Sequence, residues 1–146
     1  MAVYERILVA YDGSSHSEIA LEKAADFMAT DKRIETHVVH VMESPHTSLY
    51  ALYGADISQA MIQEMTEVAE KKIEESKELL ADYKEDCHFK QLHGRVQQQI
   101  LEYAEENKID LIIIGSRGLG AIKGMMLGSV SQYVMQHATC DVMVVK

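Results

Sequence analysis

Short apolar runs alternate with helix-like segments along this chain, and that alternation limits the possible fold more than any other feature. The runs at Arg6–Tyr11 (RILVAY), Leu111–Ile114 (LIII) and Asp141–Val145 (DVMVV) are almost continuously apolar. A strand that is apolar on both sides has to be covered on both faces, as strands in a parallel sheet are. We therefore predict an α/β fold in which helices cover both faces of a five-stranded parallel sheet.

Periodicity and turn residues give approximate limits for each element. Ser15 and Glu18 have the spacing of a capping box, so we expect the first helix to open there. The connection Glu43–Ser58 has no clear periodicity, and the sequence assigns it no role. We expect strands at 6–11, 34–42, 87–92, 111–114 and 141–145, and helices at 15–30, 59–83, 97–107 and 130–137.

Composition narrows the class of protein. With 146 residues, of which 47% are hydrophobic and one is proline, the chain is expected to form one domain spanning residues 1–146. A net charge of −9 argues against a nucleic-acid-binding surface, which needs a basic patch. No apolar stretch approaches the roughly 20 residues that span a membrane, and no export signal is recognisable. We expect a cytoplasmic protein in which Cys87 and Cys140 are reduced thiols.

Glycines frame the segment that follows the apolar run at Leu111–Ile114. It reads Gly115-Ser116-Arg117-Gly118, continues for nine residues, and ends in Gly128-Ser129 directly before the last expected helix. Glycine lets backbone N–H groups approach phosphate oxygens closely, and a helix N-terminus adds unpaired donors and a positive dipole end. The segment therefore predicts a site that holds a nucleotide by its phosphates.

A strand order of 3-2-1-4-5 would bring this glycine segment to a second turn. In doubly wound sheets, ligands bind beyond the carboxyl ends of the strands where the winding reverses, which here is between strands one and four. The first strand leads into Asp12-Gly13-Ser14-Ser15, and the fourth leads into Gly115. We expect these two turns to meet at one crevice.

The glycine segment resembles one known signature. The patterns G-x-x-x-x-G-K-[ST] and G-x-G-x-x-G are absent. The spacing Gly115-x2-Gly118-x9-Gly128-Ser129 instead matches the ATP-binding signature of the universal stress protein family. The resemblance covers essentially the whole chain, through segments 9–14 (VAYDGS), 39–41 (VHV), 100–118 and 137–145. The last of these carries Thr139 and Asp141 where the family often has prolines.

The resemblance implies a Rossmann-like (adenine nucleotide alpha hydrolase-like) fold, a homodimer and bound ATP, with Mg²⁺ or Mn²⁺ accompanying the phosphates. In ATP-binding members, the aspartate after the first strand contacts the nucleoside, and the end of the second strand contacts adenine. The loop glycines and the hydroxyl that follows them contact ribose and phosphates. The ATP-binding residues implied here are Ala10, Tyr11, Asp12, Val41, Gly115, Arg117, Gly118, Gly128, Ser129, Val130 and Ser131.

The chemistry of these residues agrees with those roles. A carboxylate at Asp12 would repel phosphate, so it should face the ribose, whose hydroxyls can donate to it. Ser129 is expected to cap the last helix and to offer its hydroxyl to a phosphate. The histidines show no metal-ligand spacing, and His37 and His40 should point to opposite faces of a strand, so no protein metal ligands are expected. No residue has the setting of a base for γ-phosphate transfer, so no catalytic residue is expected.

These observations favour an ATP-binding stress-response or signalling protein with at most slow hydrolysis. Two alternatives stay open: an interaction module that binds no nucleotide, and a nucleotide-processing enzyme on the same architecture. Such enzymes carry S-G-G-x-D-S after the first strand or an H-I-G-H motif, whereas this chain has Asp12-Gly13-Ser14-Ser15. Which stress, pathway or protein partner is involved does not follow from the sequence.

The last expected strand would lie at an edge of the sheet. An uncovered apolar edge is an aggregation hazard, which antiparallel pairing with the same strand of a second copy would remove. We therefore expect a homodimer formed through Asp141–Lys146.

Overall fold

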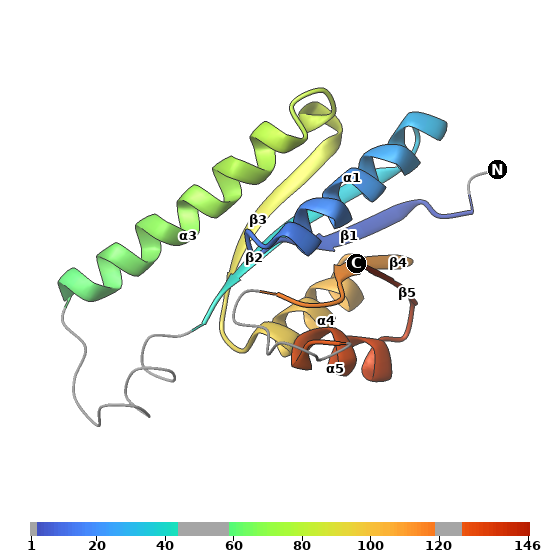
Figure 1. Cartoon of the computed structure of the whole chain (residues 1–146). Helices are drawn as coiled ribbons and strands as arrows, with labels where there is room; N and C mark the ends of the chain where they lie inside the picture. Colours follow the sequence, from blue (N-terminus) through green and yellow to red (C-terminus); the bar gives the residue numbers. More distant parts are fainter. Residues whose placement is uncertain (1–2, 44–58, 119–126) are drawn as a thin grey trace.

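Strands and helices alternate along the chain as the sequence predicts. The computed structural model describes residues 3–43, 59–118 and 127–146 (Figure 1). Most of the connection at 43–58 therefore lies outside the described residues. In chain order the elements are β1 (Arg6–Ala10), α1 (Ser15–Thr30), β2 (Glu35–Met42), α3 (Gln59–Leu79), the 3₁₀ turn η1 (Lys84–Asp86), β3 (Cys87–His93), α4 (Val96–Glu106), β4 (Leu111–Gly115), α5 (Ser129–His137) and β5 (Asp141–Val145).

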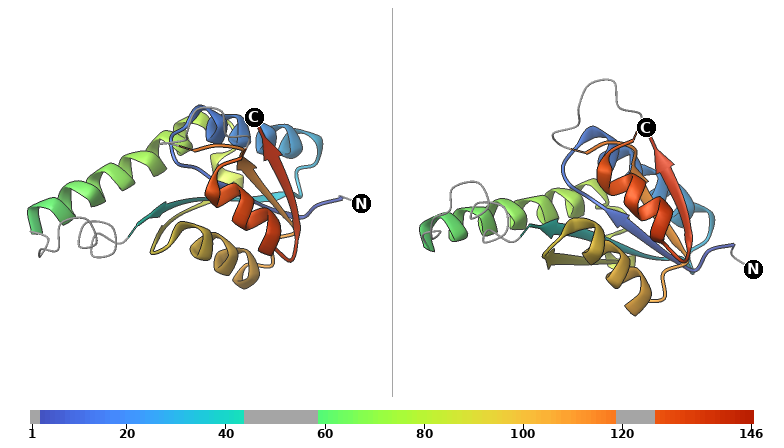
Figure 2. Two further views of the ribbon diagram at one scale, coloured as in Figure 1. Left: turned by 60° about the horizontal axis from the view of Figure 1, so that its bottom comes forward. Right: turned by 90° about the horizontal axis from the view of Figure 1, so that it is seen from below.

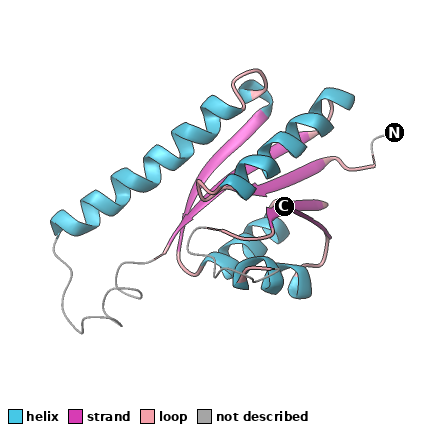
Figure 3. Ribbon diagram, viewed as in Figure 1, coloured by secondary structure: helices cyan, strands magenta, loops and turns pink. Residues whose placement is uncertain are grey.

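The five strands form a single parallel sheet in the order β3-β2-β1-β4-β5 (Figure 3). This is the predicted 3-2-1-4-5 order, so the predicted fold class is confirmed. β1 occupies the centre, where Leu8 pairs with His37 of β2 on one side and with Ile112 of β4 on the other.

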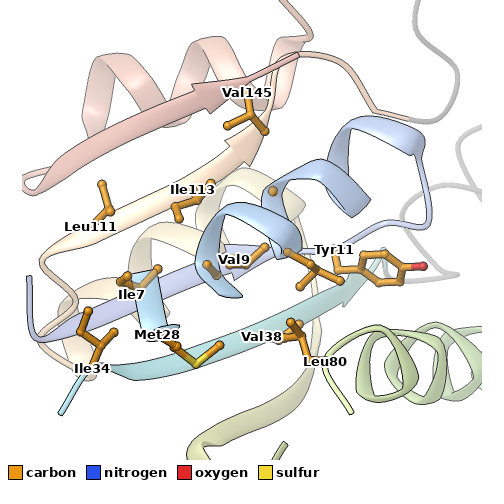
Figure 4. Close-up of a cluster of buried hydrophobic side chains, with 13 residues drawn as sticks. Ile7, Val9, Tyr11, Met28, Ile34, Val38, Leu80, Leu111, Ile113 and Val145 are labelled. Carbon is orange, nitrogen blue, oxygen red and sulfur yellow. The ribbon is translucent and has the colours of Figure 1, made fainter. Parts of the chain in front are cut away.

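Helices cover both faces of the sheet. α1 and α3 lie on one face, and α4 and α5 lie on the other (Figure 2). Alternate residues of each strand therefore enter two separate cores. Ile7, Val9 and Tyr11 join the core under α1 (Figure 4), whereas Leu8 joins the core under α4 and α5. Burying a large aliphatic side chain contributes about 1.5–3 kcal/mol, which explains why the central strands are continuously apolar.

α1 spans the predicted residues with a different cap, α3 ends four residues earlier than predicted, and the ends of α4 and the start of α5 shift by one residue. The residue that caps α1 is Ser14 rather than Ser15, because Ser14 is extended and its side chain accepts a hydrogen bond from the Ser17 N–H (3.2 Å). The expected capping box at Ser15 is therefore wrong. α3 ends at Leu79 instead of Tyr83, because the chain then tightens into three-residue turns, such as that closed by Tyr83 N–H and the Leu80 carbonyl (2.9 Å).

Among the helices that the structure describes, none is both long enough and apolar enough to cross a membrane.

Candidate functional site

The chain leaves β1 and β4 toward opposite faces of the sheet, and a hollow lies beyond the carboxyl ends of these two neighbouring strands. Its volume is about 710 Å³. Every residue that the sequence analysis assigned to ATP lines it: Ala10, Tyr11, Asp12, Val41, Gly115, Arg117, Gly118, Gly128, Ser129, Val130 and Ser131. The two turns predicted to meet at one crevice therefore do meet.

A network of short hydrogen bonds fixes the turn after β1. The Ser14 N–H donates to Asp12 Oδ1 (2.8 Å), and the Asp12 N–H donates to Ser17 Oγ (3.3 Å). Gly13 between them has φ +88°, a left-handed conformation that favours glycine. This turn fixes Asp12 in the lining of the hollow.

The glycines after β4 have different neighbours. A Cβ on Gly115 would lie 2.7 Å from His16 Cβ and 2.9 Å from the His16 carbonyl carbon, so Gly115 is needed to let α1 pack on β4. A Cβ on Gly118 would collide with Asp12 Oδ2, which shows how closely the two turns approach. A Cβ on Gly128 would make only ordinary contacts, the nearest at 3.5 Å. Packing within the chain therefore accounts for Gly115 but not for Gly128.

Ser116 joins the two ends of the glycine segment. Its carbonyl oxygen accepts hydrogen bonds from the Gly128 N–H (2.6 Å) and from Ser131 Oγ (2.9 Å). Its hydroxyl lies 2.8 Å from His16 Nδ1, which also accepts from the Arg117 N–H (3.3 Å). His16 thus braces the segment from α1 rather than lining the hollow. These contacts fix the position of the first turn of α5.

The N-terminus of α5 points its backbone donors at the hollow. Gly128 is the capping residue, and Ser129 is already the first helical residue, so the expectation that Ser129 caps this helix is wrong. Ser129 is exposed, and the Gln132 N–H makes the first bond of the helix, to the Gly128 carbonyl (3.0 Å). The N–H groups of Ser129, Val130 and Ser131 therefore have no partner inside the helix, which suits them to an anion.

Helix α3 contributes residues that the sequence analysis missed. Lys72 and Val68 line the hollow, and a Cβ on Gly13 would lie 2.6 Å from Lys72 Nζ, so this cation sits over the turn after β1. Its ammonium lies 3.6 Å from Glu75 Oε2, which also accepts the Tyr11 hydroxyl (3.1 Å). Burial and this carboxylate raise the pKa of Tyr11. No sequence signal indicated that the middle of α3 crosses the site.

His40 of β2 was also missed as a lining residue. Burial lowers its pKa, so the imidazole is neutral near pH 7. Its Nδ1 is buried and has no hydrogen-bond partner among the described residues. The apolar part of the lining also includes Val39, Val96, Ile100 and Ile114. The hollow therefore combines an apolar wall, single polar groups and a helix N-terminus, which suits a ligand with an apolar ring at one end and negative charge at the other.

These features define a class: the doubly wound α/β domains that hold ligands at the switch point of the sheet. The sequence profile of the universal stress protein family matches residues 3–146. The chain belongs to the universal stress protein family. It is 33% identical over 149 residues to the universal stress protein YxiE of Bacillus subtilis (strain 168), covering 99% of this chain and 100% of that protein. The resemblance drawn from the glycine spacing is confirmed at the level of the family.

Solved structures share the fold. The hypothetical protein MJ0577 is 30% identical, with a TM-score of 0.80 over 98% of this chain and 96% of that chain. A universal stress protein solved in complex with cAMP is 23% identical, with a TM-score of 0.67 over 97% and 96% of the two chains. The universal stress protein of Archaeoglobus fulgidus in complex with dAMP is 19% identical, with a TM-score of 0.62 over the full length of both chains.

Proposed function

We propose that this protein binds ATP in the hollow between β1 and β4 and acts as a nucleotide-dependent stress-response or signalling protein. The observation that carries the proposal is the convergence of Asp12, the glycine segment and the N-terminus of α5 on one hollow of about 710 Å³. Two fold relatives were solved with adenine nucleotides, cAMP and dAMP. We also propose that residues 1–146 form a single domain that carries this function.

The charges indicate how the nucleotide would lie. The N–H groups of Ser129, Val130 and Ser131, which have no partner inside the helix, would receive the phosphates, helped by the positive end of the helix dipole. Asp12 would accept a hydrogen bond from a ribose hydroxyl, because a carboxylate repels phosphate. The apolar wall near Val41 would hold the adenine ring. Lys72 and Arg117, both at the hollow, would offset phosphate charge.

Mg²⁺ or Mn²⁺ is proposed to arrive with the phosphates rather than in a protein cage. Mg²⁺ is commonly held by substrate phosphates, waters and one or two protein oxygens. The hydroxyls of Ser129 and Ser131 are oxygen donors that line the hollow beside the N-terminus of α5, so the residues present fit such an ion. The ion would neutralise phosphate charge beside an acidic protein.

A calorimetric titration of nucleotide-stripped protein with MgATP tests the proposal, with AMP and GTP as comparators. Tight ATP binding with weaker AMP binding is expected, because AMP lacks the β- and γ-phosphates that would reach α5. Absence of heat and of competition at millimolar ATP would overturn the proposal and favour an interaction module without nucleotide.

We propose at most slow hydrolysis. Asp12, His40 and Glu43 line the hollow, and the proposed pose gives none of them the role of a base for γ-phosphate transfer. Phosphate or pyrophosphate release measured over many turnovers decides the question. Fast multiple turnover would favour the nucleotide-processing enzyme instead.

We also propose that β5 pairs with its two-fold mate in a homodimer. β5 is an edge strand, and Val142, Met143 and Val144 are only half-buried against the rest of the chain. Pairing with a second copy would cover this edge. Sedimentation of the wild-type protein is the direct test, and a monomer at all concentrations would refute it.

A further inference from the structure

Glu35, His37 and His88 form a cluster at the end of the sheet opposite the hollow. Glu35 and His37 are two residues apart on β2 and so share a face, and His88 of β3 pairs with His37 in the register of the sheet. The two imidazole rings stack with centroids 4.6 Å apart. Glu35 Oε1 lies 2.7 Å from His88 Nε2 and 3.3 Å from His37 Nε2.

His37 faces the cluster with a buried ring nitrogen, Nε2, whose nearest polar neighbour is the Glu35 carboxylate at 3.3 Å. The residue is only 6% exposed, and its Nε2 is buried and makes no hydrogen bond among the described residues. The other ring nitrogen, Nδ1, lies 2.7 Å from the Tyr103 hydroxyl of α4. When Nδ1 donates to that oxygen, the Nε2 lone pair points into the cluster. A buried polar atom without a partner costs about 1–3 kcal/mol, so a ligand for it would stabilise the fold.

The three donor atoms are spaced for one ion. They all lie within 4.8 Å of one another. Ligands about 2.0–2.2 Å from a tetrahedral zinc ion lie roughly 3.4 Å apart, so Glu35 and His88 would have to shift. The His88 ring would also have to rotate out of its stack on His37, because an imidazole lone pair lies in the plane of its ring. Glu35 and His88 are half-exposed, which leaves them free to adjust and leaves a fourth position open to water.

Two neighbouring residues, Arg6 and Tyr103, orient the side chains of the cluster. Arg6 Nε lies 3.4 Å from Glu35 Oε2, so the guanidinium holds one carboxylate oxygen and leaves Oε1 toward the histidines. Tyr103 plays the part of the outer hydrogen-bond partner that fixes the orientation of a metal-binding imidazole. Two imidazole nitrogens and one carboxylate oxygen suit Zn²⁺ and other divalent first-row transition metals rather than Mg²⁺ or Ca²⁺.

We propose that Glu35, His37 and His88 bind one zinc-type divalent ion, with Tyr103 as a positioning residue. The ion would join β3, an edge strand, to β2 at their amino ends. The site is independent of the proposed nucleotide site, which lies at the carboxyl ends of β1 and β4. The sequence analysis expected no metal ligands because the spacing in sequence is unremarkable, and only the strand register brings His88 beside His37.

Titration of tag-free, chelator-stripped protein with Co²⁺ and then Zn²⁺ tests the proposal. We expect one ion per chain, the visible absorption bands of tetrahedral Co²⁺, and their loss when Zn²⁺ displaces Co²⁺. His88→Ala and Glu35→Gln should abolish the bands. Tyr103→Phe should retain the bands but weaken affinity by about 10–100-fold. His137→Ala removes an exposed histidine from α5 and is the matched control, which should bind as wild type does.

Two outcomes would overturn the proposal. One is the absence of tetrahedral Co²⁺ bands in the wild-type protein, and another is equal binding by wild type and His88→Ala. Far-ultraviolet circular dichroism of each variant separates lost binding from lost folding, and His88 is exposed enough that its removal should leave the fold intact. MgATP titration of His88→Ala should give the wild-type affinity, so failure of the metal site and failure of the nucleotide site are distinguishable.

Discussion

Gly128→Val separates ligand binding from folding at the first turn of α5. Gly128 has φ −72° and ψ 162°, an extended conformation that a β-branched residue adopts without strain. The added Cβ would lie 3.5 Å from the Ser116 carbonyl oxygen and 3.6 Å from Ser131 Oγ, both ordinary contacts. Losing a glycine cap costs at most about 1 kcal/mol of unfolding free energy. The variant should therefore fold.

The effect on affinity should be much larger. The valine methyl groups would stand before the N–H groups of Ser129, Val130 and Ser131, where we place the phosphates. Each hydrogen bond to a charged group contributes about 1.5–3 kcal/mol, so blocking two of them costs about 3 kcal/mol or more. At about 1.4 kcal/mol for each factor of ten, Kd for MgATP should rise by about 100-fold or more.

The assay is calorimetric titration with MgATP beside thermal unfolding of the same samples. Gly115→Ala is the contrasting variant, because its Cβ would lie 2.7 Å from His16 Cβ and should destabilise the fold itself. If Gly128→Val unfolded at the wild-type temperature and bound MgATP with the wild-type Kd, the N-terminus of α5 would not be the phosphate site.

Three further predictions concern the fold and assembly. Ile113→Ala, at a fully buried position of β4, should lower the free energy of unfolding by about 2–5 kcal/mol in urea denaturation, and a loss well under this range would contradict the packing described. Burial raises the pKa of the Cys87 thiol to about 11, so at pH 8 it should react with iodoacetamide far more slowly than the same thiol in the urea-unfolded chain. Because the pKa of Cys87 is higher in the folded protein than in the unfolded chain, the contribution of Cys87 to the free energy of unfolding is complete below the unfolded pKa of about 8.5. This contribution is lost as the pH rises toward 11. Rapid alkylation at pH 8 would show that the thiol is exposed. Met143→Lys should convert the proposed dimer to monomer in sedimentation, since the aliphatic stem can stay against the core while two like charges face each other across the two-fold axis; an unchanged dimer would place the interface elsewhere.

The strands and their order follow from local sequence. Leu111–Ile114 is apolar at every position, which indicates a strand covered on both faces. With the strand order 3-2-1-4-5, the two unusual turns meet at the switch point. All the residues assigned to the nucleotide lie next to these two turns or at the end of β2, which is why the sequence was sufficient to bring them together.

The missed residues depend on packing between distant elements. Lys72 reaches the hollow because of how α3 lies across β2, and His88 meets His37 because of a strand register that no local pattern encodes. The prediction that Ser129 caps α5 was wrong by one residue. Gly128 already has the extended conformation of a capping residue, and the serine hydroxyl that bonds near the helix start belongs to Ser131. Cap positions shift by one residue when several candidates stand together.

The Ser116 carbonyl has a practical consequence. By accepting from Gly128 and Ser131, it closes the intervening segment at its base, so the chain enters and leaves at one fixed point. The entropy of joining two fixed points of a chain grows only slowly with the length of the segment between them. A fluorescent protein or a sensing peptide grafted between residues 119 and 126 would thus leave the first turn of α5 in register with the sheet. A domain held together in this way would suit a genetically encoded reporter of the nucleotide that we propose it binds.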